Sequence, residues 1–278
     1  MPKKSPRSGV TKRLELEYEQ ALRKVVAKML PPKGSTSTIQ EWIDSILHRS
    51  DSPQIQKLIQ SLAGQMVRWV NVASARSWRE AAARSQRSRM LYRLLQSEMR
   101  GSVGQRVREL VSENARLIRS IPVEAAAMTA NEILKLQQQG ARPKTIERAM
   151  RIQFPHHTRA RIRLIARTET MKASAALTEA RATHLGVQWY VWRTSHDQRV
   201  RTSHRHMEDV LVRYDRPPQP EALIGIRSTL GKYQAGNAPN CRCVQLPVLD
   251  FDDIRWPHKV FDGRTIRWMG KKEFEAIS

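Results

Sequence analysis

Two cysteines in the second half of the chain are of a type and spacing that could bind a metal ion. Cys241 and Cys243 are separated by one residue, and thiolate and imidazole are the ligands that Zn²⁺ prefers. Zinc fingers usually place about two to four residues between their cysteines, so packing as small buried residues is the alternative. Further metal-capable side chains lie upstream, at His196, Asp197, His204 and His206. We therefore expect either a zinc site at His204, Cys241 and Cys243 or no cofactor at all.

The same polar segment offers a second chemistry, hydrolysis of DNA by a bound metal. Asp197, His204 and His206 would be the residues of such a nuclease or DNA-modifying enzyme. No second acidic residue lies close by to complete a two-metal site. Glu169 is expected to pair with an arginine of its own helix, because no other carboxylate at helical spacing could share acid and base duties with it. The sequence therefore favours a protein that is not an enzyme and has no catalytic residues.

Arginines between Arg76 and Arg108 provide a third kind of chemistry, the binding of phosphate. Only Glu80 and Glu98 oppose them, and the planar guanidinium binds phosphate through a fork that lysine lacks. A solvated helix face is the alternative interpretation. We expect contacts with double-stranded DNA, without sequence preference, from Arg76, Arg79, Arg84, Arg87, Arg89, Arg93 and Arg100.

Composition agrees with a polyanionic partner. The chain has 278 residues, with 49 Lys and Arg against 26 Asp and Glu, and its formal net charge is +23. Such an excess of positive charge keeps a protein soluble, but the charges repel one another in the compact state. It is therefore typical of proteins that bind nucleic acid. Hydrophobic residues make up 40% of the chain, which is enough to form a core. No apolar run approaches the ~18–20 residues of a membrane span, so we expect a soluble protein made in the cytoplasm.

The elements that would position these residues are mostly helices. The first 120 residues have apolar residues at helical spacing, with a stop at Pro31 to Gly34 and a new helix from Ser52-Pro53. Gly101 and Gly104 bracket an expected break, and Pro122 should end or bend the helix that follows. Helices are then expected over 123–139, from Pro143 to just before Phe154-Pro155, and over 158–185 with a cap at Gly186.

Strands are expected only in the last third, over 187–193, 210–214 and 244–249. The pattern after residue 249 assigns no element. The fold class expected is α+β and predominantly helical, with a helical N-terminal region followed by a small mixed α+β domain of a few short strands. The expected divisions are a partner- and DNA-contacting region at 1–120, a domain at 121–250 and an extension at 251–278.

Three spaced motifs and an aromatic strand occur in order between residues 166 and 243. They are Ala166 to Glu169 in the long helix, Trp189 to Trp192 in the strand, Asp197 with Arg201 and His204, and Asn240 to Cys243. This order resembles the Mu F-like family of phage head morphogenesis proteins, over about residues 115–249. The residues that match the family motifs are Arg167, Glu169, Asp197, Arg201, His204, Asn240, Cys241 and Cys243. One departure is visible, because Met207-Glu208-Asp209 stands where the family usually has a glycine soon after the histidine.

The resemblance implies a minor head protein of a tailed double-stranded DNA phage or prophage. Such a protein is expected inside the virion head, and in the host cytoplasm during assembly. Its implied partners are the portal protein, other head proteins and double-stranded DNA, with no membrane involved, and its role lies in head assembly and in packaging or delivery of DNA. Mu F-like domains are also found joined to toxin domains, but the residues after Leu249 are too few to form one. We expect residues 1–120 to dock on the portal.

Overall fold

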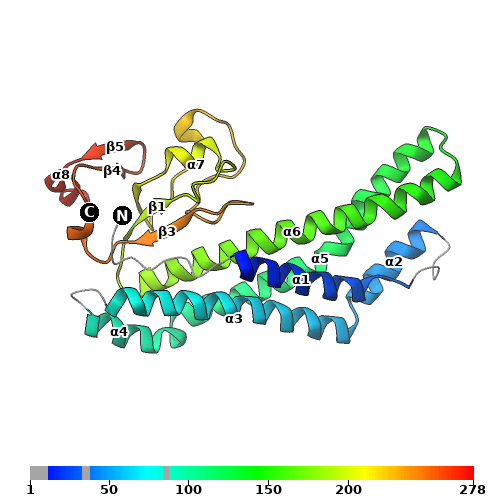
Figure 1. Ribbon diagram of the computed structural model, residues 1–278, viewed down its shortest axis with the longest axis horizontal. Coiled ribbons are helices and arrows are strands. Elements are labelled where there is room, and N and C mark those ends of the chain that lie inside the picture. The colour runs from blue at the N-terminus through cyan, green and yellow to red at the C-terminus, as the bar shows by residue number, and fades with distance from the viewer. Residues whose placement is uncertain (1–11, 33–37, 84–87) are drawn as a thin grey trace. The chain divides into compact units, whose positions relative to one another are not determined.

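The computed structural model describes residues 12–32, 38–83 and 88–278. The first part is helical: α1 (Lys12–Met29), α2 (Ile39–Ser50), α3 (Pro53–Ala83), α4 (Ser88–Ser97), the 3-10 turn η1 (Glu98–Arg100), α5 (Ser102–Gln138) and α6 (Pro143–His184). The second part is mixed: β1 (Trp189–Arg193), α7 (Thr202–His206), β2 (Val210–Arg213), η2 (Ala222–Ile224), β3 (Val244–Pro247), η3 (Phe251–Asp253), β4 (His258–Phe261), β5 (Ile266–Met269) and α8 (Lys271–Glu275). This sequence of elements, visible in Figure 1, confirms the expected fold class.

Local sequence signals explain several helix ends. Thr38 caps α2, since its hydroxyl accepts from the Glu41 amide while the Glu41 carboxylate accepts from the Thr38 amide. Gly140 and Gly186 follow α5 and α6 with φ of 73° and 71°, in the left-handed region that glycine enters without steric cost. Gly101 separates η1 from α5, so the expected break is present at Gly101, whereas Gly104, the other expected boundary, lies inside α5.

Two prolines do not end helices, which corrects the expected boundaries. α5 runs through Pro122, and α6 runs through Pro155 as one helix from Pro143 to His184. A proline inside a helix removes one backbone hydrogen bond and costs about 3 kcal/mol. Around Pro122 the apolar face of α5 is buried, at Ile118, Ile121 and Ala125. Burial of that face stabilises the helix enough to offset the loss.

The described residues divide into two compact units, each formed from separate segments of the chain. The first unit contains Arg68–Arg108 and Thr170–Ser278, and the second unit contains Lys12–Val67 and Glu109–Glu169. In the second unit, one apolar cluster joins Ile46 of α2, Ala125 and Ala126 of α5, and Phe154 of α6. In the described part of the chain, no helix is both long and apolar enough to cross a bilayer.

The five-stranded sheet belongs to the first unit and has the order β3-β1-β2-β4-β5. β1 is antiparallel to both β2 and β3, β2 and β4 are parallel, and β4 and β5 are antiparallel. Both faces are covered, because alternate residues of β1 enter different cores. Tyr190 and Trp192 pack with Trp78 of α3 and Leu91 of α4, whereas Trp189 and Val191 pack with Phe274 of α8.

The expected division at residue 120 lies within α5, and that at residue 250 lies between β3 and β4 of this sheet. Residues 251–278, for which the sequence assigned no element, contribute two strands and a helix to the first unit. The functional division into three regions remains a prediction.

Candidate functional site

His204, Cys241 and Cys243 come together in the interior of the first unit. His204 lies on the short helix α7, and the two cysteines lie just before β3. The Nδ1 atom of His204 is 3.5 Å from the Cys241 sulfur and 3.4 Å from the Cys243 sulfur. The three side chains could hold a metal ion, because their donor atoms lie within 4.8 Å of one another. All three are buried, with 2%, 4% and 2% of their surfaces exposed.

The other ring nitrogen of His204 contacts a buried tyrosine. His204 Nε2 is 2.9 Å from the Tyr233 hydroxyl, which in turn lies 2.8 and 2.9 Å from the two carboxylate oxygens of Glu221. An ionised carboxylate only accepts hydrogen bonds, so the single proton of Tyr233 is donated to Glu221. His204 must then donate its Nε2 proton to Tyr233. In the neutral ring this places the proton on Nε2 and leaves the Nδ1 lone pair facing the two sulfurs, which is the form in which an imidazole binds a metal.

The protonation states of the cluster differ between its two cysteines. A hydrogen bond from the Cys243 thiol lowers the pKa of Cys241, and His204 lowers it further against the opposing effect of burial. Donating that bond, together with burial, raises the pKa of Cys243. Burial also raises the pKa of Tyr233, and the neighbouring Glu221 raises it further. The cluster therefore has one sulfur that ionises readily beside a phenol that keeps its proton.

Two further contacts join the same pair of segments. Arg242 forms an ion pair with Asp197 at 2.6 Å, and Arg201 donates to the Pro239 carbonyl at 2.8 Å. Asp197 also accepts from the Arg199 amide, which forms a local turn. The Asp197 and Arg201 motif residues thus hold the cysteine loop at the segment that carries His204.

Backbone conformation explains two positions near the cluster. Asn240 has φ of 56° directly before Cys241, and asparagine tolerates this left-handed conformation better than most residues. Asp209 has φ of 61° and donates its amide to the Trp192 carbonyl at 2.9 Å. This conformation lies five residues after His204, where the family usually has a glycine close by. The turn therefore keeps a glycine-like backbone with aspartate in place of glycine.

The helix motif at Arg167 and Glu169 lies in the other unit. Arg167 donates to the Glu15 carboxylate at 3.2 Å. Glu169 is buried, and its charge adds to the effect of burial in raising the pKa of Tyr18, while a hydrogen bond from Tyr18 to Asn114 opposes the rise. These interactions connect α6 to α1 within that unit.

The arginines expected to contact DNA are placed on the solvent faces of their helices as far as they are described. Arg79, Arg93 and Arg100 are exposed. Arg76 is exposed too, but it forms an ion pair with Glu80 at 3.0 Å. Arg84 and Arg87 lie outside the described residues, as does the side chain of Arg89.

The residues of the nuclease alternative are not gathered into one site. His206 is exposed whereas His204 is buried, and Asp197 is engaged by Arg242. In the described residues, the group able to hold a metal contains neither Asp197 nor His206. The geometry gives this alternative no support.

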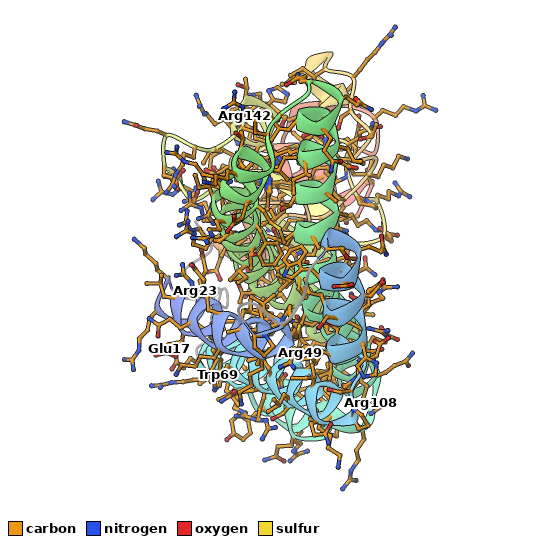
Figure 2. The ribbon with its side chains drawn as sticks, turned by 90° about the vertical axis from the view of Figure 1, so that its right-hand side faces the viewer. Glu17, Arg23, Arg49, Trp69, Arg108 and Arg142 are labelled. Carbon is orange, nitrogen blue, oxygen red and sulfur yellow. The ribbon has the colours of Figure 1, made fainter. Side chains whose placement is uncertain are left out.

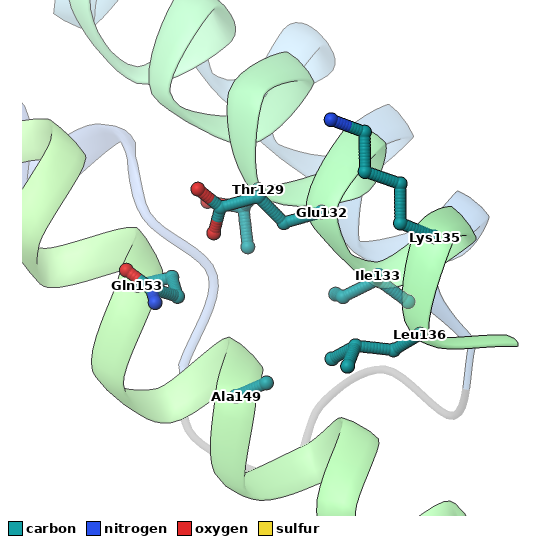
Figure 3. A pocket seen from close by; sticks show the side chains of 7 residues that line it. All are labelled: Thr129, Glu132, Ile133, Lys135, Leu136, Ala149 and Gln153. Carbon is teal, nitrogen blue, oxygen red and sulfur yellow. The ribbon is translucent and has the colours of Figure 1, made fainter. Parts of the chain in front are cut away.

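A cavity of about 210 Å³ lies in the other unit, between α5 and α6. Figure 3 shows Thr129, Glu132 and Leu136 of α5 on one side and Ala149 and Gln153 of α6 on the other. Its lining combines a few polar groups with aliphatic side chains, and none of the lining residues belongs to a motif. It offers no set of groups arranged for chemistry.

Sequence reasoning did not include Tyr233 or Glu221 in the candidate site. They lie 29 and 17 positions from His204 in a segment of irregular structure, and neither periodicity nor motif spacing singles them out. A buried imidazole needs a partner for its second nitrogen. That requirement signals a missing residue but does not identify it.

Comparison with known proteins gives the family of this region. Residues 127–246 match the family described as "Phage Mu protein F like protein", which confirms the resemblance carried by the motifs. A protein of Haemophilus influenzae, named only as uncharacterized, is 31% identical over 149 residues. That match covers 54% of this chain and 31% of the relative, so the chain spans about a third of the relative's length. No solved structure matches. The family match supports a phage head morphogenesis protein.

Proposed function

We propose that the chain is a minor head protein of a tailed double-stranded DNA phage or prophage. In this proposal it sits inside the virion head, acts at the portal during assembly in the host cytoplasm, and contacts DNA during packaging or delivery. The family match over residues 127–246 is the observation that carries the proposal. The net charge of +23 supports the DNA contact independently.

A stripe of basic side chains on α6 supports the DNA contact further. Four exposed residues are spaced so that they lie within about a third of the helix circumference; they are Lys144, Arg148, Arg159 and Arg163. Exposed Arg151 lies on the same face, paired with Glu147, and Arg163 lies 3.8 Å from the Glu19 carboxylate. Figure 2 shows other basic side chains, among them Arg23, Arg108 and Arg142, on the outside of the ribbon. Cations along one helix face suit a regular array of phosphates and carry no means of reading bases.

Binding of the full chain to two unrelated DNA duplexes over a range of salt concentrations tests the DNA contact. Both duplexes should bind equally, with affinity falling steeply as salt rises. Replacing Lys144, Arg148 and Arg159 by Gln should flatten the slope of log affinity against log salt by up to about 2.7, because each phosphate contact contributes about 0.9. A second triple variant at Arg79, Arg93 and Arg100 tests the other arginine group in the same way.

A matched control removes three positive charges that already have carboxylate partners. Arg13, Arg23 and Arg119 pair with Glu17, Glu19 and Asp51. The triple Gln variant at these positions loses the same net charge as either test variant, and we expect its salt slope to stay close to wild type. Equal slopes in all three variants would assign binding to net charge alone, and binding insensitive to salt would remove the DNA contact.

The portal contact is proposed for the helical N-terminal region. Leu16 of α1 and Leu47 of α2 are 46% and 41% exposed, and we take them as part of the apolar surface that would contact the portal. A fragment ending at residue 120 would cut α5 and separate the buried partners Glu98 and Arg181. The test therefore uses the full chain.

Co-purification with the portal protein of the same phage tests this contact. Leu16→Asp with Leu47→Asp should abolish it, because a charged side chain cannot be buried in an apolar interface without a partner. The control is Trp268→Ser, which removes another exposed apolar side chain, 64% exposed on β5. Loss of the portal by the Trp268 variant and retention by the leucine variant would reverse the assignment.

A further inference from the structure

We propose that His204, Cys241 and Cys243 bind one Zn²⁺ ion with a structural role in the first unit. The proposal is independent of the function proposed above. It rests on distances, on the tautomer of His204 and on burial.

The distances between the donor atoms fit a tetrahedral zinc ion. Zn–S bonds of about 2.3 Å and Zn–N bonds of about 2.0–2.1 Å at tetrahedral angles place sulfur and nitrogen about 3.5–3.6 Å apart. The two observed separations from His204 Nδ1 are 3.4 and 3.5 Å. The single proton of the Cys243 thiol is donated to Cys241, so a hydrogen bond to Nδ1 does not account for the short distance between Cys243 and His204. A shared metal ion explains why both sulfurs lie at nearly the same distance from it.

The surroundings of His204 are those of a metal ligand. A ligating histidine generally donates its other N–H to a carboxylate, carbonyl or water, which fixes the tautomer and orients the ring. Here the Tyr233 hydroxyl accepts a hydrogen bond from that N–H and donates its own proton in a hydrogen bond to Glu221. The ring edge is also packed against Trp192, with centroids 5.6 Å apart. The imidazole is therefore held with its free lone pair toward the sulfurs before any ion arrives.

The fourth tetrahedral position is assigned to a water molecule. A small cavity with room for about one water is lined by Cys243 and Gln245, together with residues of α6. Gln245 is 4% exposed, and its Oε1 atom accepts no hydrogen bond from the described residues. A water in this cavity would have that atom as an acceptor. Three protein ligands and a water are the usual set of a catalytic zinc, but this cavity is too small for a substrate, and we therefore assign the ion a structural role.

The position of the site explains what the ion would hold in place. His204 and the two cysteines join the same segments that are connected by the Asp197–Arg242 ion pair and by the bond from Arg201 to Pro239. These contacts are partly exposed and individually weak. A zinc ion would connect the segments strongly, because the free energy of metal binding adds to the free energy of folding.

Metal analysis of the full-length protein, purified under reducing conditions without chelator, tests the site. We expect about one zinc per chain and a lower melting temperature after chelation. Replacement of zinc by Co²⁺ should give the visible absorption of a tetrahedral thiolate site. Cys241→Ser with Cys243→Ser should bind no metal. Reduced wild-type protein with two free thiols, no zinc and no cobalt spectrum would overturn the proposal, as would a disulfide between the cysteines with no metal uptake after reduction.

A variant that keeps all three ligands protects the test against failure to fold. Tyr233→Phe should retain the 1:1 stoichiometry at saturating zinc but weaken affinity about 10–100-fold, since it removes the partner of His204. The matched control is Tyr214→Phe in the same core, because the Tyr214 hydroxyl has no hydrogen-bond partner among the described residues. Equal zinc affinities of the two variants in competition with a chelator would refute the assigned role of Tyr233 and Glu221.

Discussion

Arg181 of α6 donates to both carboxylate oxygens of Glu98, at 2.8 and 2.9 Å, with both side chains buried. Nη1 of Arg181 donates to Ser74 of α3 at 2.8 Å, and Nη2, which donates to Glu98, also donates to Asn71 of α3 at 2.6 Å. Removing a charge pair from water is costly unless further hydrogen bonds compensate, and here the guanidinium donates four. These bonds join α3, η1 and the C-terminal part of α6 within the unit that carries the sheet.

Loss of the carboxylate from this pair should be strongly destabilising. Glu98→Gln leaves the Arg181 charge buried without its counterion, and we expect the free energy of unfolding to fall by about 3–5 kcal/mol. Glu80→Gln is the control, because it breaks the exposed pair with Arg76 and should cost less than about 1 kcal/mol. Urea denaturation measures both losses. Equal small losses would show that the Glu98 site admits water.

The left-handed conformation of Asp209 gives a prediction about the turn after α7. Glycine adopts φ of 61° without steric cost, so Asp209→Gly should leave stability nearly unchanged. A β-branched residue cannot, and Asp209→Val should lose about 1–2 kcal/mol. Thermal or urea unfolding of the two variants measures the difference. A glycine variant as unstable as the valine variant would mean that the side chain, rather than the backbone, fixes this turn.

Sequence reasoning located the elements whose signals are local. The helix ends at Gly140 and Gly186 follow from the conformational freedom of glycine, and the aromatic run at Trp189 to Trp192 predicted β1. The helix boundaries predicted at Pro122 and Pro155 were wrong, because burial against other elements keeps the helix intact through the proline, and such burial cannot be inferred from the local sequence. The strands β4 and β5 were missed because Lys259 and Arg267 interrupt their apolar pattern and because β4 pairs in parallel with the non-adjacent β2.

The candidate site was predictable only in part for the same reason. The chemistry of cysteine and histidine singled out His204, Cys241 and Cys243, and the structure brings them together. Tyr233, Glu221 and the Arg181–Glu98 pair depend on contacts across 12 to 83 positions of chain. Those contacts are set by how the segments pack, and residue types alone do not encode them in a readable pattern.

Glu208 should make stability depend on pH in the acidic range. Burial alone would raise the pKa of its carboxyl, but hydrogen bonds from Thr194 and Arg193 outweigh burial and lower it. A carboxyl whose pKa is lower in the folded than in the unfolded protein stabilises the fold at pH values above its unfolded pKa of about 4.3. That stabilisation is lost as the pH falls through the pKa of the folded state. Wild-type protein should therefore lose more stability below about pH 5 than Glu208→Gln does.

The control for this pH effect is Glu275→Gln, which removes the same charge from an exposed position on α8. Denaturant unfolding across the acidic range, on wild type and both variants, gives the comparison. Glu275→Gln should follow the wild-type pH profile. A Glu208 variant that also follows it would contradict the assigned hydrogen bonds.

Gly236 lies against the cysteine loop, and its replacement should be more harmful than its backbone angle alone explains. Its φ is 91°, and an added Cβ would lie 3.0 Å from the Ala175 Cβ and 3.2 Å from the Cys243 carbonyl oxygen. Gly225 has φ of 74° with no atom within 4 Å of such a Cβ. Gly225→Ala should thus lose only the conformational cost of about 1–2 kcal/mol.

Gly236→Ala should lose that cost and a further amount, because α6 and the Cys243 backbone must move apart to admit the methyl group. Urea denaturation of both glycine variants isolates the steric part as the difference between their losses. Ala175→Gly in the Gly236→Ala background should recover some of the steric loss, since this substitution removes the closer of the two contacts. Ala175→Gly alone should cost up to about 1 kcal/mol, because it places a glycine within a helix. Equal losses at Gly236 and Gly225 would mean that the turn yields easily, and that the cysteine loop is not held by close packing against α6.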